Sequence, residues 1–418
     1  MAEQESKESV SRRQFLGKTS AALVAAASLP LVAAAQQTVD KSGDSHTGVN
    51  EQYLGPRNKA LDDAEPDSVY PPTTDAGGQP PFKYPFSFGH KRIEDAGWTR
   101  QVTVRDFPLS KKMAGVEMRL IKGGIRELHW HVGAEWAIMT GGSARITAVD
   151  AHGRGFVEDV NEGDLWLFPG GVPHSIQGLG PNGCQFLLVF DDGNFNEFET
   201  FLLTDWLHHT PKEILAKNFN VPASTFDSVP KRELFIFERD LPRPLAEEKK
   251  AVEAANGPMP HSLAFFTSKM KPTKVTAGGS VKIIDRSNFP ITNIAAAIVT
   301  LKPGGLRELH WHPNEDEWQY YVKGTARMTV FAAGGHARTM DFHPGDVGYI
   351  DRSLPHYVEN IGDTDLVFLE IFPTPDYQAI SLGEWLAHTP SRLVSQHLGV
   401  SEDFLAKISK KEAVITPE

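Results

Sequence analysis

Short runs of alternating apolar and polar residues, separated by glycine, aspartate and proline, dominate the chain from about residue 95. Examples are SARITAV (143–149), GDLWLFP (163–169) and QFLLVF (185–190). A period of two places successive side chains on opposite faces of a strand, and turn residues at regular intervals are typical of β-sandwiches and barrels. The pattern therefore predicts an all-β fold with a few short helices appended.

The same pattern occurs twice along the chain. GGSARITAVDAHGRGFVEDVNEGD (141–164) aligns with KGTARMTVFAAGGHARTMDFHPGD (323–346), and TDWLHHTPKEILAKNFNV (204–221) aligns with GEWLAHTPSRLVSQHLGV (383–400). The second pair of segments predicts a helix with Thr210 as its N-cap, followed by Pro211 and a capping-box glutamate. Each copy is therefore expected to be a β domain followed by one or two helices.

The predicted organisation has five parts, since 418 residues are enough for two domains of ordinary size. They are a signal peptide (1–35), an extended N-terminal arm (36–85), a first β domain (86–235), a surface-running connector (236–280) and a second β domain (281–418).

Residues 1–35 resemble a twin-arginine export signal. SRRQFLGK (11–18) carries adjacent arginines before a short alanine-rich stretch that ends near Ala35 and is interrupted by Ser28 and Pro30. Such a stretch is too short for a comfortable membrane span. We therefore expect a periplasmic or secreted protein without stable membrane association. The alternative is a disordered basic tail.

Composition excludes several classes of protein. Apolar residues make up 40% of the chain and charged residues 23%, which is typical of a soluble globular protein. The net charge is −11 and no basic stripe is present, so nucleic acid is not an expected partner. The single cysteine, Cys184, excludes an internal disulfide and a thiolate-rich metal site.

One group of histidines and a carboxylate is repeated at nearly equal spacing. GGIRELHWH (123–131) and GGLRELHWH (304–312) start 181 residues apart. Each is followed by a glutamate and, 43 or 44 residues after its second histidine, by a third histidine. The first set is His129, His131, Glu135 and His174, and the second is His310, His312, Glu317 and His356.

Each set has the composition of a metal site. The two histidines of a His-x-His segment point to the same face of a strand, whereas Trp130 and Trp311 between them point to the other. Histidines with purely structural roles would not be expected to recur as a complete set. Three nitrogens and one oxygen suit an octahedral ion such as manganese or iron better than structural zinc. Spacing alone does not choose the metal.

These motifs resemble those of the cupin family and, more narrowly, of bicupin oxalate decarboxylases. The likeness rests on the paired RELHWH motifs and on GDLWLFPGGVPH (163–174), DDGNF (191–195), TDWLHHTP (204–211) and PHYVEN (355–360). The resemblance implies two tandem cupin domains of the β-sandwich or jelly-roll type, Mn²⁺ at each of the two sites, and oxalate as substrate. It also implies a catalytic requirement for O2 and a homo-oligomer, either a trimer or a hexamer.

The resemblance further implies a flexible lid over the first site. The matching segment is Asn-Glu-Phe-Glu-Thr (196–200), which makes Glu197 the expected proton donor. The common bacterial lid reads Ser-Glu-Asn-Ser-Thr, so three positions differ. Arg126 lies three residues before His129 and is expected to pair with a substrate carboxylate.

The second copy lacks a lid of this kind. Arg307 and Glu370 match the corresponding arginine and glutamate of the family, but PTPDYQAISL (373–382) has no glutamate at the matching point. The first site is therefore expected to carry the chemistry, and the second to be structural or to relay electrons.

Three functions remain open at this stage. The first is decarboxylation of oxalate to formate and CO2. The second is oxidation of oxalate to CO2 and hydrogen peroxide on the same scaffold, which the altered lid keeps open. The third is a non-catalytic metal-binding bicupin, against which Arg126 and Glu197 argue.

Overall fold

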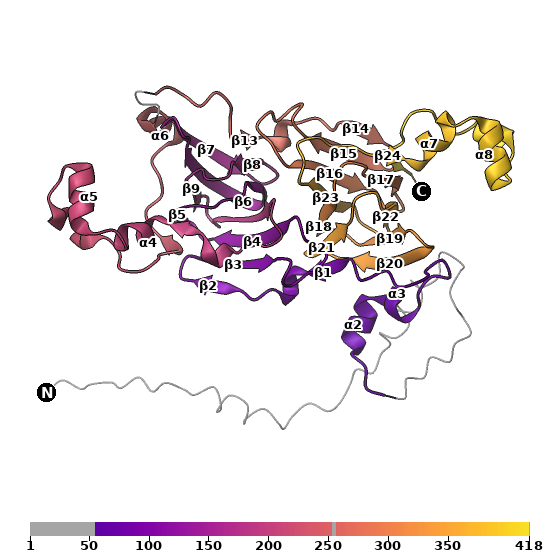
Figure 1. Ribbon diagram of the computed structural model, residues 1–418, viewed down its shortest axis with the longest axis horizontal. Coiled ribbons are helices and arrows are strands. Elements are labelled where there is room, and N and C mark those ends of the chain that lie inside the picture. The colour runs from indigo at the N-terminus through magenta and orange to yellow at the C-terminus, as the bar shows by residue number, and fades with distance from the viewer. Residues whose placement is uncertain (1–54, 253–255, 418) are drawn as a thin grey trace. The chain divides into compact units, whose positions relative to one another are not determined.

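The computed structural model describes residues 55–252 and 256–417. The expected signal peptide, residues 1–35, and the start of the expected arm lie outside these residues. Strands dominate the described chain (Figure 1). No helix within the described ranges is long and apolar enough to cross a membrane.

The first domain is a β-sandwich whose two layers share one long strand, β6 (Glu135–Val149). The first half of β6 pairs with β8 and β10, and its second half pairs with β7 and β9. The strand bends near Gly142, where φ is +74° and a Cβ would lie 2.1 Å from a backbone oxygen, so only glycine fits. The other strands are β2 (Arg92–Glu94), β3 (Gly97–Val102), β4 (Ala114–Leu120), β5 (Gly124–Trp130), β7 (Gly155–Asn161), β8 (Leu165–Phe168), β9 (His174–Gly178), β10 (Cys184–Phe190) and β11 (Phe201–Leu202).

The second domain repeats this arrangement as two separate sheets. One has the order β1-β21-β18-β23-β16-β15-β14 and the other β20-β19-β22-β17-β24, with β25 paired to β17. The counterpart of β6 is divided into β18 and β19 around Gly324, where φ is +86°. The strands are β14 (Lys274–Thr276), β15 (Gly279–Ile284), β16 (Ala295–Leu301), β17 (Leu306–Trp311), β18 (Glu317–Lys323), β19 (Ala326–Ala332), β20 (His336–Phe342), β21 (Asp346–Ile350), β22 (His356–Asn360), β23 (Leu366–Phe372), β24 (Ile380–Ser381) and β25 (Ile415–Thr416).

Alternate residues of the central strands belong to two different cores. In β10, Phe186 and Leu188 lie inside the first sandwich. Leu187 and Val189 alternate with them along the strand. They pack in a second cluster, which also contains Trp318 of the second domain. Each face of the strand buries apolar area, and both contribute to its stability. The continuous apolar run QFLLVF is therefore explained by packing of the two domains against each other.

The segments before and between the domains are partly built into them. The described part of the arm forms α2 (Lys59–Ala64), α3 (Pro66–Val69) and β1 (Lys83–Pro85), and β1 pairs with β21 of the second domain. Residues 236–280, expected to be a surface connector, contribute β12 (Ile236–Glu238) to β5 and β13 (Ala264–Phe265) to β8. Pairing with these strand edges satisfies backbone groups that a free loop would leave to water.

Three α-helices lie near the end of each copy (Figure 1). After the first copy come α4 (Leu203–His208), α5 (Lys212–Phe219) and α6 (Leu245–Val252), and after the second come α7 (Leu382–His388), α8 (Ser391–Leu398) and α9 (Glu402–Leu405). Four 3-10 helices are η1 (Phe86–Phe88), η2 (Glu197–Glu199), η3 (Ala223–Ser228) and η4 (Thr267–Lys269). The predicted all-β class, with two tandem sandwich domains and short helices, is confirmed.

The predicted N-cap is wrong. Pro211, in an extended conformation, occupies the N-cap position of α5 and makes no side-chain capping bond. The Thr210 hydroxyl instead donates to the carbonyl of Trp206, 2.7 Å away in the preceding helix. The last carbonyls of a helix lack intrahelical partners, and here they attract the threonine hydroxyl.

Candidate metal centres and their surroundings

The four residues of each predicted set meet at strand ends. In the first copy, His129 lies in β5 opposite His174, the first residue of β9, and Glu135 is the first residue of β6. The second copy repeats the register, because His310 lies opposite His356 and Glu317 begins β18. The strand period of two directs both histidines of His-x-His inward.

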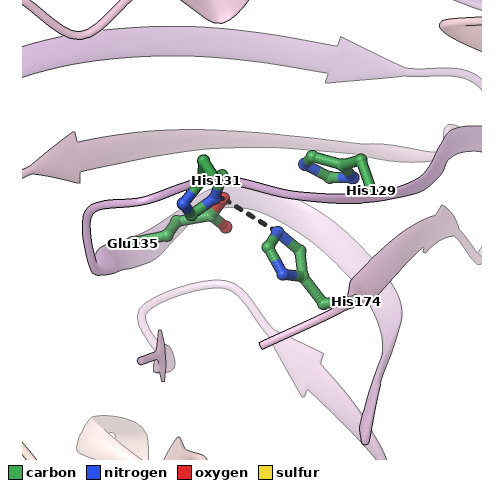
Figure 2. Close-up of side chains that lie close together, drawn as sticks. All are labelled: His129, His131, Glu135 and His174. Carbon is green, nitrogen blue, oxygen red and sulfur yellow. Dashed lines mark hydrogen bonds and ion pairs between the residues drawn. The ribbon is translucent and has the colours of Figure 1, made fainter. Parts of the chain in front are cut away.

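The side chains of each set converge on one point. In each set, one potential ligand atom from every residue lies within 4.8 Å of the others. In the first set the Glu135 carboxylate lies 3.1 Å from His131 Nε2 and 3.4 Å from His174 Nε2 (Figure 2). In the second, the Glu317 carboxylate lies 3.3 Å from His312 Nε2 and 2.9 Å from His356 Nε2. All eight side chains are buried.

Backbone carbonyls orient the imidazoles. All six Nδ1 atoms lie 2.6–2.9 Å from a carbonyl oxygen, and these oxygens belong to Glu127, Gly133, Val172, Glu308, Gln378 and Leu354. An Nδ1–H that donates to a carbonyl leaves Nε2 unprotonated and directed toward the centre of the site. This arrangement is characteristic of metal-ligating histidines.

Burial and neighbouring charges favour the metal-binding protonation states in the first set. Burial, reinforced by the positive charge of Arg126, lowers the pKa of His129 well below its usual value. Burial also lowers the pKa of His174. Burial opposes ionisation of Glu135, but the adjacent His174 and His131 outweigh it and lower the pKa of this carboxyl. Neutral imidazoles and an ionised carboxylate are the forms that bind a cation.

In the second set, Glu317 and His356 favour each other's charged forms. The pKa of Glu317 lies well below its usual value, because His356 and His312 outweigh the effect of burial. Burial lowers the pKa of His356, but the Glu317 carboxylate more than compensates and raises it. A cation binds the neutral imidazole of His356, so its binding competes with protonation there. His174 Nε2, His356 Nε2 and Glu317 Oε2 are buried and, although carboxylate and imidazole lie close together, none of the three makes a hydrogen bond of good geometry in the described chain, as expected for atoms that ligate a metal.

A buried ion pair borders the first centre. Arg126 Nε donates to Glu197 Oε1 over 2.9 Å, and both side chains are 1% exposed. Arg126 Nη2 donates to Thr200 Oγ1 over 2.8 Å. The remaining nitrogen, Arg126 Nη1, is buried and has no hydrogen-bond partner among the residues described. Such an N–H is costly to bury unless an acceptor, for example a substrate carboxylate, joins it.

Glu197 occupies an inward position in the predicted lid. It begins η2, whose next two residues, Phe198 and Glu199, are exposed. Burial raises the pKa of Glu197, and the opposing effect of Arg126 does not cancel this shift. A carboxyl with a raised pKa holds its proton at a higher pH than an exposed one and is therefore suited to deliver it.

The corresponding arginine of the second centre has no free nitrogen. Arg307 donates through Nε to Glu370 over 3.0 Å, through Nη1 to the carbonyl of Val414 over 3.3 Å, and through Nη2 to the hydroxyl of Tyr377 over 2.9 Å. The Tyr377 hydroxyl in turn donates to Glu370 over 2.9 Å. The predicted residues Arg307 and Glu370 thus form a closed network.

Sequence reasoning missed the supporting carboxylates of the RELHWH motifs. Glu127 accepts backbone hydrogen bonds from Thr204, Leu234 and Phe235, each over 2.9 Å. Glu308 accepts from Ser381 and from the backbone of Val414. Phe235 and Val414 have positive φ angles of 54° and 61°, so these glutamates hold strained residues beside the two arginines. The glutamate occurs at the same place in both RELHWH motifs, and this repetition could have indicated its supporting role.

Comparisons with known proteins agree with this architecture. The sequence pattern of the cupin family matches residues 87–226 and 267–404. The oxalate decarboxylase OxdC of Bacillus subtilis (strain 168) is 51% identical over 358 residues, which cover 85% of this chain and 92% of that protein. A probable oxalate decarboxylase of Arthroderma benhamiae is 39% identical over 95% of this chain and 99% of its own length.

A solved structure also matches this chain over most of its length. A structure of the Bacillus subtilis oxalate decarboxylase, a protein with Mn(II) centres, superimposes with a TM-score of 0.86 at 49% identity and covers 89% of this chain and 98% of that one. The chain therefore belongs to the cupin family and, within it, to the bicupin oxalate decarboxylases.

Proposed function

We propose that this chain is an enzyme that decarboxylates oxalate, converting oxalate and one proton to formate and CO2. The observation that carries the proposal is the buried Arg126–Glu197 pair beside the first four-residue centre, with Arg126 Nη1 unpartnered. The similarity to named oxalate decarboxylases supports it.

Mn²⁺ is the proposed metal at both centres, and O2 is a proposed catalytic co-substrate. The donor set of three imidazole nitrogens and one carboxylate oxygen fits Mn²⁺ and leaves coordination positions for other ligands. Bound manganese would supply a Lewis acid for one oxalate carboxylate and, with O2, a transient acceptor for one electron.

The residues of the chain supply binding and proton transfer. Arg126 offers Nη1 to the ionised carboxylate of monoprotonated oxalate and so holds the substrate in a water-poor site. Glu197 accepts the proton of monoprotonated oxalate and later returns it to the carbon from which CO2 has departed. The inward position of Glu197 beneath exposed lid residues limits access of bulk water to this carbon.

The first centre is the proposed catalytic site. Arg126 keeps a buried nitrogen for substrate, whereas each nitrogen of Arg307 already has a protein partner. A carboxylate entering the second centre would have to displace Glu370 or Tyr377. We therefore assign the second centre a structural or electron-relaying role.

The first testable consequence is dependence on manganese. Removal of metal with a chelator is expected to abolish formate production and to lower the Tm, because the buried imidazoles and carboxylates lose the cation that they bind in the folded state. Readdition of Mn²⁺ is expected to restore both, whereas Mg²⁺, which prefers oxygen ligands, is the matched control. Full activity in protein verified to be metal-free would refute the assignment.

A homo-oligomer, a trimer or a hexamer, is also proposed. Trp206 and Trp385 are 62% and 58% exposed, occupy equivalent places in the two copies, and contact Trp130 and Trp311 respectively. Exposed tryptophans at repeated positions are typical of contact surfaces. Mass photometry is expected to show trimers or hexamers for the wild type and smaller species for Trp206→Ser combined with Trp385→Ser. A monomeric wild type contradicts this proposal.

Export by the twin-arginine route remains a proposal that rests on residues 1–35. Its test is N-terminal sequencing of protein recovered from the periplasm or the medium. Mature protein beginning near residue 36 supports export, and a full-length chain confined to the cytoplasm contradicts it.

A further inference from the structure

Gln101 on β3 contacts the lid through hydrogen bonds separate from those of Arg126. Its Oε1 accepts a hydrogen bond from the backbone N–H of Glu197 over 2.9 Å. Its Nε2 donates to the side-chain oxygen of Asn196 over 3.2 Å. One half-buried amide thus contacts both the residue expected to carry the proton and the residue before it.

The polarity of this contact requires one acceptor and one donor at position 101. Asn196 Oδ1 also accepts from the backbone N–H of Phe198 over 3.2 Å, where it caps η2. This oxygen therefore needs donors, and the Glu197 N–H needs an acceptor. A glutamine provides one of each in a single planar group, whereas leucine of similar size provides neither.

The other side-chain hydrogen bonds that tie the lid to the barrel come from Arg126, a group that substrate would disturb. Glu197 and Thr200 are held through their side chains by Arg126. In the proposed reaction Arg126 also pairs with an oxalate carboxylate, and Glu197 releases its proton to carbon. The bonds from Gln101 reach the backbone of Glu197 and the side chain of Asn196, which take no part in either event.

We propose that Gln101 is a positioning residue that keeps residues 196–200 closed over the first centre during turnover and so determines how oxalate is divided between two products. This inference rests on the proposed function. With Glu197 in place, oxalate and one proton give formate and CO2. With Glu197 displaced, no proton reaches the carbon, and oxalate, O2 and two protons give two CO2 and one hydrogen peroxide.

The principal test is Gln101→Leu in the manganese-loaded enzyme. Loss of both hydrogen bonds is expected to lower the rate of formate production about tenfold and to raise the ratio of peroxide to formate. Metal content is expected to stay at the wild-type value. Gln185→Leu is the matched control, because Gln185 is a half-buried strand residue with no hydrogen bond from its side chain in the described structure. Its product ratio is expected to match the wild type.

Two further variants separate positioning from folding. Asn196→Ala removes the hydrogen bond from Gln101 Nε2, together with the cap of η2, and leaves β3 and the bond to the Glu197 N–H in place. It is expected to shift the product ratio in the same direction. Gln101→Glu retains the acceptor for Glu197 N–H, and when protonated it also retains the donor for Asn196. It is therefore expected to match the wild type near pH 4 and to lose formate production relative to the wild type as the pH rises toward about 6.

An assay without oxalate makes the inference independent of the reaction. A glutamate-specific protease is expected to cleave after Glu197 or Glu199 about tenfold faster in Gln101→Leu than in the wild type, because the lid opens more often. Unchanged cleavage and an unchanged product ratio overturn the role of Gln101. Faster cleavage with an unchanged product ratio overturns its control of the products. If the wild type makes no formate, but Gln101→Leu is still cleaved faster than the wild type, the proposed function is refuted and the role of Gln101 in holding the lid stands.

Discussion

Glu197→Gln is expected to abolish formate production while the metal content of the protein stays at the wild-type level. The glutamine keeps the size of the side chain and can still accept a hydrogen bond from Arg126, but it cannot carry the proton that carbon must receive. General acid–base groups typically contribute about 10²- to 10⁴-fold to rate, so a loss in that range is predicted. Formate would be quantified alongside elemental analysis for manganese.

A control for this experiment lies in the same segment. Glu199 is exposed, whereas Glu197 is buried, although both belong to η2. Glu199→Gln is therefore expected to keep wild-type formate production. Loss of manganese from Glu197→Gln would indicate a structural residue, and near-wild-type activity would remove Glu197 from the mechanism.

Arg126→Lys is the second substitution with a large expected effect. Lysine keeps the positive charge but cannot bond Glu197, Thr200 and substrate at once through a planar guanidinium. We expect kcat/KM for oxalate to fall by at least about 100-fold, in line with the loss of a charge-assisted hydrogen bond at a reacting group. Steady-state kinetics over a wide range of oxalate concentration measures this directly.

Arg145 offers a matched control for Arg126. It is also buried, lies in the first domain and pairs with Asp159 and Glu248, neither of which belongs to the metal centre. Arg145→Lys is expected to lower the Tm with little change in kcat/KM. Equal losses of kcat/KM in both variants would show that the effect at Arg126 reflects general disruption of the domain and not contact with substrate.

The metal centres were accessible from sequence because their signals are periodic. A period of two directs both histidines of each His-x-His segment to one face, and the repeated spacing brought His174 and His356 into the same sets. The structure places all eight residues as two compact groups. Glu197 and Arg126 were assigned through resemblance to a family, and the structure pairs them in a buried contact.

Other features depended on contacts between distant segments. Tyr377 lies seven residues after Glu370, yet its significance appears only when its hydroxyl is seen between Glu370 and Arg307. Gln101 is separated from Glu197 by 96 residues and belongs to no motif. The Thr210 capping prediction failed because a carbonyl of the preceding helix was the better partner. Local pattern does not determine such choices, because tertiary packing decides them.

Product analysis of the manganese-loaded wild-type enzyme, given oxalate in air at about pH 5, tests the central claim most directly. The account predicts formate in a ratio near one to one with oxalate consumed, and little hydrogen peroxide. Hydrogen peroxide with little formate would contradict it and would show that the altered lid directs the same centre to oxidation.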